Sequence, residues 1–292
     1  MNDVHDALQA EMGKPHGARD SSRCASRFAN LKNTMSPSTD SLALALEHVS
    51  VHFEGLRALH DVSFTVSSGE IVGMIGPNGA GKTTAFNVAC GFIKPSAGRV
   101  LFPNRGHTNL RPNQLARAGV ARTLQGVGLF PHCTVLENVM AGGQVRQNGG
   151  FVSGFLSLPS GVRSERSLRR DALAMLERLG IAHMASRLPS AIPYGVGKKV
   201  SVARALMCEP TLLLLDEPAS GLDEAERDDF AALITRLRST MGVLLVEHDM
   251  EFVMPLVDRL VVLNFGQVIA SGTPDEVRDD AAVIAAYLGV DE

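Results

Sequence analysis

The sequence predicts an α/β fold in which a mostly parallel sheet carries helices on both faces. Two unbroken apolar runs, residues 211–216 and 243–246, are typical of strands buried on both faces of such a sheet. The amphipathic pattern of residues 224–240 predicts a helix between them. A glycine-rich stretch at residues 76–84 stands between a third apolar run, residues 70–75, and another helical pattern. This strand–loop–helix unit fits the same fold class and adds a ligand site to it.

The first part of the chain has two different characters. Residues 1–40 mix charged and small residues with few large apolar ones, so we expect a disordered extension. Met35 lies shortly before the first strand pattern, and we hypothesise that the natural protein begins there. Residues 42–53 and 58–66 have strand-like spacing around a Glu54-Gly55 turn, which predicts a β-hairpin ahead of the glycine-rich stretch.

Shorter elements follow the glycine-rich stretch. A helix is predicted at residues 82–90, a break at 95–98 and a strand at 99–102. Residues 114–118 indicate a short helix, and a further helix is expected at 197–207.

Residues 126–190 differ from this alternation of strands and helices. A short helical pattern at residues 135–141 is followed by a glycine- and serine-rich segment at 142–161 and by an amphipathic helical pattern at 163–179. The region therefore predicts a helical insert with a flexible middle. Its arginine cluster is interpreted as a solvated helix face and comprises Arg163, Arg166, Arg169 and Arg170.

The glycine-rich stretch has the pattern G-x-x-x-x-G-K-T of a phosphate-binding loop. Glycines let the backbone turn its N–H groups toward phosphate oxygens at the positive end of the following helix. Lys82 is expected to reach the β- and γ-phosphates, and the Thr83 hydroxyl to ligate Mg²⁺. The expected nucleotide-binding residues here are Gly76, Pro77, Asn78, Gly79, Ala80, Gly81, Lys82, Thr83 and Thr84.

Acidic residues and a histidine follow the two later apolar runs. Asp216 can hold the Mg²⁺ shell, and Glu217 can act on an attacking water. His248 adds a donor or acceptor near the γ-phosphate. Ligands in parallel sheets bind at the carboxyl ends of strands, where the loop and these three residues are all expected.

Composition restricts the function further. The formal charge of -3 argues weakly against an extended nucleic-acid surface, and we expect no nucleic-acid partner. Four cysteines lie far apart without metal-binding spacing, which is typical of isolated thiols in a reducing compartment. No apolar run reaches the roughly 18 residues that span a bilayer, so membrane association is expected to come through a partner.

With these motifs, the span from about residue 42 to residue 289 resembles an ATP-binding-cassette (ABC) ATPase. The resemblance implies a P-loop NTPase core with an antiparallel β-subdomain and a helical subdomain insert. The ABC ATPase domain would cover residues 41–289, with the helical subdomain at about 126–200 and a tail at 290–292. ATP and Mg²⁺ are the implied cofactors.

The resemblance also implies roles for residues that spacing alone does not identify. Gln125 matches the Q-loop glutamine, which senses Mg²⁺ as a ligand and faces the transmembrane partner. Residues 219–223 resemble the D-loop, and His248 the switch histidine. Phe53 lies where the family places an aromatic residue that stacks on adenine, although a plain hairpin core residue remains the alternative. The implied catalytic set is thus Glu217, His248 and Gln125, with Thr83, Gln125 and Asp216 on the metal.

The signature segment departs from the common Leu-Ser-Gly-Gly-Gln form. It is Ile192-Pro193-Tyr194-Gly195-Val196, followed by Gly197 and a helix at residues 200–207. Tyr194 and Gly195 are expected to contact nucleotide, with Gly195 offering its backbone N–H. Pro193 has no hydroxyl, and Val196 and Gly197 replace polar residues, which predicts slow or partner-dependent turnover.

The family works as a dimer, so two cassettes, identical or paralogous, are expected to enclose two ATP molecules and to move transmembrane permease subunits. Finer wording, such as Ala121-Arg122-Thr123-Leu124-Gln125, resembles ATPases that import branched-chain and other hydrophobic amino acids. A periplasmic solute-binding protein would then be an indirect partner, and the chain would lie at the cytoplasmic face of the bacterial inner membrane. The alternatives are urea or amide import, lipopolysaccharide export, and a catalytically weakened regulatory module.

Overall fold

A computed structural model describes residues 41–103, 106–123, 126–144 and 159–288 of the chain. The predicted extension at residues 1–40, most of the glycine- and serine-rich segment, Gln125 and the tail at 290–292 lie outside these ranges. The expectations made for them therefore stay predictions.

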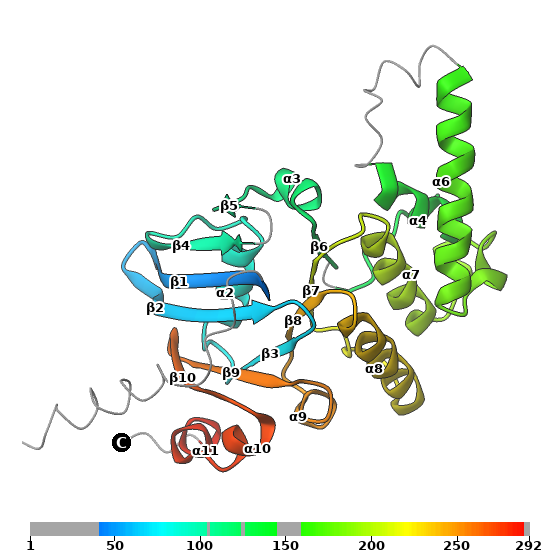
Figure 1. Ribbon diagram of the computed structural model, residues 1–292. Coiled ribbons are helices and arrows are strands. Elements are labelled where there is room, and N and C mark those ends of the chain that lie inside the picture. The colour runs from blue at the N-terminus through cyan, green and yellow to red at the C-terminus, as the bar shows by residue number, and fades with distance from the viewer. Residues whose placement is uncertain (1–40, 104–105, 124–125, 145–158, 289–292) are drawn as a thin grey trace, which may run out of the picture. The chain divides into compact units, whose positions relative to one another are not determined.

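The larger sheet contains the strand that enters the glycine-rich loop. Its order is β10-β9-β3-β8-β7-β6 (Figure 1). Neighbouring strands are parallel except for the antiparallel pair β9–β10, which confirms the predicted mostly parallel sheet. The strands are β3 (Ile71–Ile75), β6 (Val120–Arg122), β7 (Leu212–Asp216), β8 (Gly242–Val246), β9 (Arg259–Asn264) and β10 (Gln267–Gly272).

A smaller, antiparallel sheet has the order β2-β1-β4-β5. The predicted hairpin forms between β1 (Leu42–Phe53) and β2 (Leu56–Ser67) around the Glu54-Gly55 turn. β4 (Ala97–Phe102) begins two residues before the predicted strand, and β5 (His107–Thr108) pairs with it. The early start depends on Gly98, where an added Cβ would lie 2.2 Å from the His48 carbonyl oxygen. The glycine read as a break thus allows close strand pairing.

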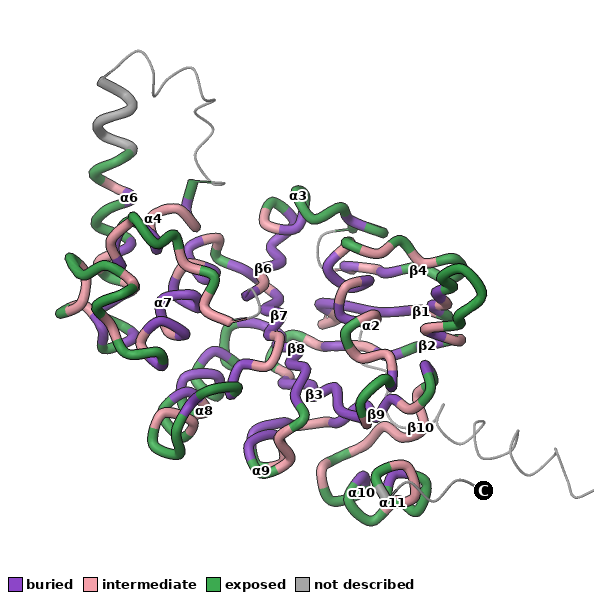
Figure 2. Tube along the Cα trace, turned by 180° about the vertical axis from the view of Figure 1, so that it is seen from behind, coloured by how far each residue is buried: buried purple, intermediate pink, exposed green. Residues whose placement is uncertain are grey.

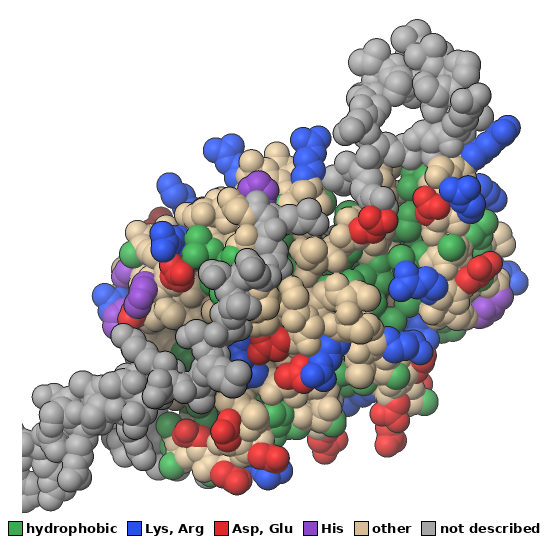
Figure 3. All heavy atoms as spheres, viewed as in Figure 1, with side chains coloured by type: hydrophobic (Ala, Val, Ile, Leu, Met, Phe, Trp, Pro, Cys, Tyr) green, Lys and Arg blue, Asp and Glu red, His purple; other side chains and the backbone are tan. Residues whose placement is uncertain are grey.

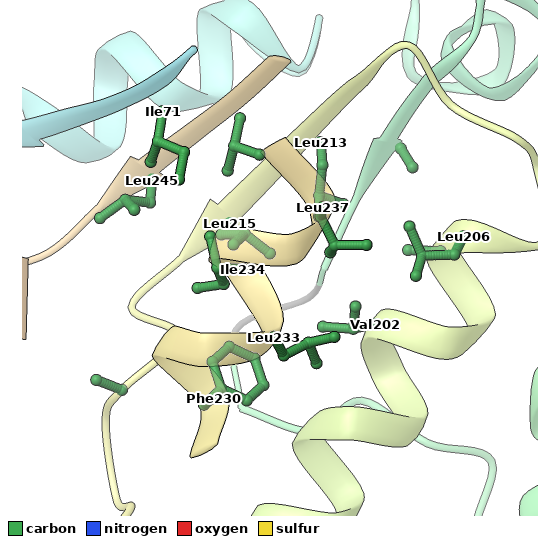
Figure 4. Close-up of a cluster of buried hydrophobic side chains, with 14 of the residues drawn as sticks. Ile71, Val202, Leu206, Leu213, Leu215, Phe230, Leu233, Ile234, Leu237 and Leu245 are labelled. Atoms are coloured by element: carbon green, nitrogen blue, oxygen red, sulfur yellow. The ribbon is translucent and has the colours of Figure 1, made fainter. Parts of the chain in front are cut away.

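Alternating leucines explain why the buried strands are apolar throughout. Leu213, Leu215 and Leu245 face one cluster of buried side chains, together with α7 (Tyr194–Leu206) and α8 (Glu224–Arg238), as Figure 4 shows. Leu212, Leu214 and Leu244 face a second cluster, together with α2 (Lys82–Ala89) and strands of the smaller sheet. The sheet is covered on both faces, and β3, β8 and nearly all of β7 and β9 are buried, whereas the edge strand β10 is only partly buried (Figure 2).

The helical insert packs as three helices, α4 (Val135–Gly143), α6 (Pro159–Arg178) and α7. Asn138, fully buried in α4, accepts from the Phe130 N–H and donates to three carbonyls, which fixes the segment before the helix. α6 begins four residues before its predicted start. Its arginines Arg166, Arg169 and Arg170 are exposed, as interpreted, and the side chain of Arg163 lies outside the described residues. Figure 3 shows several Lys and Arg side chains on the surface of the protein near the helix that Figure 1 labels α6.

The predicted short helix at residues 114–118 is divided into α3 (Pro112–Leu115) and a 3₁₀ turn, η4 (Ala116–Ala118). Two further 3₁₀ turns, η6 (Ala182–Met184) and η7 (Pro189–Ala191), precede α7. The C-terminal part adds α9 (Met250–Val253), α10 (Pro274–Arg278) and α11 (Ala281–Leu288), which sequence patterns had not assigned. Within the described ranges, every helix is too short or too polar to cross a bilayer.

Candidate functional site

The phosphate-binding loop connects β3 to α2, as predicted. Gly76, Gly79 and Gly81 have φ values of 151°, 80° and 100°, in the region that favours glycine. A Cβ on Gly76 would lie 2.1 Å from the Leu263 carbonyl oxygen, whereas one on Gly79 would meet nothing within 4 Å. The loop therefore packs against β9 at its start and has open space at Gly79, where backbone N–H groups can meet a ligand.

Lys82, the first residue of α2, folds back over this loop. Its Nζ donates to the carbonyl oxygens of Gly76 at 2.7 Å and Pro77 at 2.9 Å. Burial lowers the pKa of Lys82, and the Glu217 carboxylate opposes that shift. The ammonium group is thus held at the phosphate-binding loop, where it feels the charge of Glu217. Thr83, next along α2, is exposed.

Asp216 and Glu217 stand at the carboxyl end of β7. Asp216 is the last residue of the strand and pairs with Val246 of β8. Burial raises the pKa of Asp216, and the neighbouring Glu217 adds to the shift, whereas Arg122 and Lys198 oppose it. The Glu217 side chain is 37% exposed. One carboxylate is therefore half-buried at the strand end, and the other is accessible to solvent.

His248 follows β8, the neighbouring strand. Its Nδ1 lies 3.8 Å from Glu217 Oε1, and its side chain is 60% exposed. The phosphate-binding loop, the acidic pair and His248 therefore follow three adjacent parallel strands, β3, β8 and β7, at their carboxyl ends. This is the arrangement that the sequence predicts.

Glu247, directly before His248, is a functional candidate that the sequence patterns did not identify. It is 1% exposed, and burial raises its pKa. Its Oε1 accepts from the Ala219 N–H at 2.8 Å, and its Oε2 from the His248 N–H at 3.1 Å. Glu247 thereby ties residues 219–223 to the His248 backbone. An acid directly after an apolar strand was the available signal.

The segment around Tyr194 differs from expectation, because α7 begins at Tyr194 rather than at residue 197 or 200. Pro193 is the N-cap, a place where its missing N–H costs nothing. Val196 packs against the core, and a Cβ on Gly197 would lie 2.9 Å from Val127 Cγ1. The apolar Val196 and small Gly197 thus match their packing environment.

Tyr194 and Gly195 lie on the α8 side of the site. A Cβ on Gly221 would be 3.0 Å from Tyr194 Cε1, and one on Gly195 would be 2.4 Å from Glu226 Oε1. Both residues therefore pack against the start of α8 and the turn before it within this chain.

Phe53 is the last residue of β1, and its side chain is 44% exposed. Gln125 is outside the described residues; Thr123, two positions earlier, donates its N–H to the Leu214 carbonyl at 3.0 Å.

Comparisons with known proteins agree with this geometry. A family model described as "ABC transporter" matches residues 59–220. A second, described as "Branched-chain amino acid ATP-binding cassette transporter", matches residues 267–292.

Individual relatives match along nearly their whole length. The chain is 41% identical over 248 residues to the high-affinity branched-chain amino acid transport ATP-binding protein BraF of Pseudomonas aeruginosa, covering 84% of this chain and 97% of BraF. The corresponding protein LivG of Escherichia coli K12 is 40% identical with the same coverage. The lipopolysaccharide export system ATP-binding protein LptB of Escherichia coli K12 is 33% identical over 249 residues, covering 85% and 98%.

Solved structures show the same architecture. A nucleotide-free ATP-binding cassette from an ABC transporter superposes with a TM-score of 0.74 at 31% identity, covering 84% of this chain and 98% of that one. A dimeric cassette in a post-hydrolysis state, bound to ADP and Pi, superposes with a TM-score of 0.65 at 25% identity, covering 79% and 98%.

Proposed function

The chain belongs to the ATP-binding cassette family of transporter ATPases, and from that premise we propose that it hydrolyses Mg²⁺-bound ATP to drive import of branched-chain or other hydrophobic amino acids. The observation that carries the proposal is the convergence of Lys82, the Asp216–Glu217 pair and His248 at neighbouring strand ends. These are the groups that phosphoryl transfer to water needs around one site.

The direction and solute of transport rest on relatives. Identity is 41% to BraF and 33% to the lipopolysaccharide export protein, and the C-terminal match at residues 267–292 is to the branched-chain family. These two findings favour amino-acid import over lipopolysaccharide export. An ATPase of urea or amide import shares the same site chemistry and is the nearer alternative.

The nucleotide-binding roles follow from the loop geometry. Backbone N–H groups of residues 76–84 and the Lys82 ammonium hold the phosphates, with the open space at Gly79 on the ligand side. Phe53 stacks on adenine. In a dimer of cassettes, Tyr194 and Gly195 of each copy complete the site of the other copy.

Hydrolysis depends on the carboxylates. Glu217 accepts a proton from the attacking water, and His248, 3.8 Å away, orients it and the γ-phosphate. Thr83, Asp216 and Gln125 would hold Mg²⁺, and the charges of Arg122 and Lys198 favour the ionised Asp216 that a metal ligand requires. When bound, Mg²⁺ neutralises charge on the phosphate oxygens.

A groove beside α7 supports contact with a permease. It has a volume of about 380 Å³ and is lined mostly by apolar and small residues: Val127, Gly128, Leu129, Pro131, Pro189, Ile192, Pro193, Tyr194 and Gly197. Its lining includes residues of the segment after Gln125 and of the start of α7, so a permease helix bound there would contact both segments. The protein would then lie peripherally at the cytoplasmic face of the bacterial inner membrane, with a solute-binding protein on the far side.

The deciding experiment compares the wild-type protein with Glu217→Gln and with Glu177→Gln, a matched change at an exposed position of α6. Phosphate release from ATP is measured for the purified protein alone and with its permease in lipid. We expect Glu217→Gln to lower kcat by at least about 100-fold and to trap an ATP-bound dimer, with Glu177→Gln unchanged. ATP binding without phosphate release in every setting would instead favour a catalytically weakened regulatory module.

A further inference from the structure

Lys198 is a charged residue buried behind the site. It lies on α7, one turn after Tyr194, and is 5% exposed. Lysine is almost never buried to this extent unless its charge is paired. Its Nζ donates to the carbonyl oxygen of Glu217 at 3.1 Å. Burial lowers the pKa of Lys198, and the charges of three nearby carboxylates oppose that shift: Glu247, Glu217 and Asp216.

The Glu217 backbone needs such support because its φ is 46°. A left-handed conformation is strained for a non-glycine residue and persists only where surrounding contacts hold it. The Glu217 N–H donates to the Val246 carbonyl at 2.9 Å. The Glu217 carbonyl accepts from Lys198 and, at 3.3 Å, from the Ser220 N–H. Both peptide groups of Glu217 are therefore held, and with them the direction of its side chain.

Tyr194 fastens the same two segments at a second point. Its ring packs beside Gly221, and the Lys198 Nζ lies 5.6 Å from the ring centroid, within the range of a cation–π contact. Successive turns of α7 therefore contact the stretch that runs from Glu217 to Gly221. A shift of α7 would be transmitted to Glu217 through these contacts.

We propose that Lys198 is a positioning residue for hydrolysis: it holds the Glu217 peptide so that the carboxylate faces the attacking water, and it couples that orientation to α7. The inference rests on the proposed function, in which Glu217 acts on water. A lysine that only balanced buried carboxylates would affect stability and leave the turnover of folded protein unchanged.

The test compares Lys198→Met with Lys199→Met, the same change one residue along α7, where the ammonium pairs with Asp229 of α8 instead. Steady-state phosphate release is measured against ATP concentration, and folding is checked by thermal unfolding. Loss of a charged hydrogen bond that orients the reacting group should lower kcat by about 10- to 100-fold for Lys198→Met. The KM for ATP should stay within about threefold, since the phosphate-binding loop is untouched, and Lys199→Met should keep both constants.

Lys198→Arg keeps the charge and a donor, but its planar head reproduces the single Nζ contact poorly. Its kcat should lie between those of the wild type and Lys198→Met. If Lys198→Met does not fold, Lys198→Arg is the variant that tests the positioning role. If folded Lys198→Met has a kcat within about twofold of wild type, the positioning role is overturned and the proposed function stays intact. If Lys198→Met does not fold, the same result for Lys198→Arg has the same meaning. A wild-type protein that releases no phosphate with its permease would overturn both.

Discussion

Replacing Phe53 by alanine should weaken the binding of ATP while leaving the binding of its phosphate chain intact. The ring stands at the end of β1 and is 44% exposed, although phenylalanine is among the residues most often buried. The proposed stacking on adenine would use this open aromatic face.

The expected magnitude follows from the exposed surface. A phenylalanine side chain has about 200 Å² of surface, so an exposure of 44% leaves about 90 Å² for a base to cover. At about 25 cal/mol per Å², covering that surface stabilises the complex by about 2 kcal/mol. This corresponds to about a 30-fold rise in the Kd of Phe53→Ala for ATP.

The assay is calorimetric titration of wild type, Phe53→Ala and Phe53→Tyr with ATP and, separately, with inorganic tripolyphosphate. Phe53→Tyr keeps the ring and should bind ATP like the wild type. Phe265→Ala removes a ring that is 78% exposed in the turn between β9 and β10, and serves as a control of the same chemistry. Of these variants, only Phe53→Ala should lower the affinity for ATP while keeping the affinity for tripolyphosphate.

Two results would refute the reasoning. Unchanged ATP affinity in Phe53→Ala would make Phe53 a hairpin surface residue. An equal loss of affinity for ATP and tripolyphosphate would mean that the substitution disturbs the phosphate-binding loop rather than a base contact.

Two further predictions concern packing and titration. Gly142→Ala should lower the free energy of unfolding by about 2 kcal/mol, measured by urea denaturation. The added Cβ would lie 1.9 Å from the Arg204 carbonyl oxygen where α4 crosses α7, and the better helix propensity of alanine offsets only about 1 kcal/mol of that clash. A more stable variant would contradict this close approach of the two helices. Burial raises the pKa of Cys90 from 9.0 to about 12, so in the native protein this thiol should resist alkylation at pH 8 while the unfolded protein reacts. Because the folded state keeps this proton where the unfolded state loses it, stability should fall as pH rises from about 9 to 12, and the fall should be smaller in Cys90→Ala; an equal pH dependence in both proteins would contradict the shift.

Local patterns in the sequence were sufficient for the elements that bear the site. The unbroken run at residues 211–216 predicts a strand covered on both faces, and Leu213 and Leu214 do face opposite clusters. The glycine spacing of residues 76–84 predicts a sharp backbone turn, and the φ values of Gly79 and Gly81 lie in the left-handed region that favours glycine. Both inferences succeed because side-chain periodicity and glycine conformation are properties of neighbouring residues.

Other elements could not be read from neighbours. The pattern around Pro193 predicts a segment ahead of a later helix, yet Pro193 caps α7, which starts at Tyr194. Gly98 was read as part of a break, although it lies within β4 and allows the strand to approach His48. Proline and glycine usually interrupt regular structure. Here the N-cap position favours Pro193 and the close strand contact favours Gly98, and neither can be recognised from residue spacing.

The sequence by itself determined the fold class, the phosphate-binding loop and the position of the acidic pair and His248 at the carboxyl ends of strands. Only the tertiary structure decided which charged residues are buried and what they hold. Sequence patterns give Lys198 and Glu247 no role, yet Lys198 donates to the Glu217 carbonyl and Glu247 accepts from the Ala219 N–H. Burial of a charge depends on partners brought together from distant positions, so it is a property of the assembled fold.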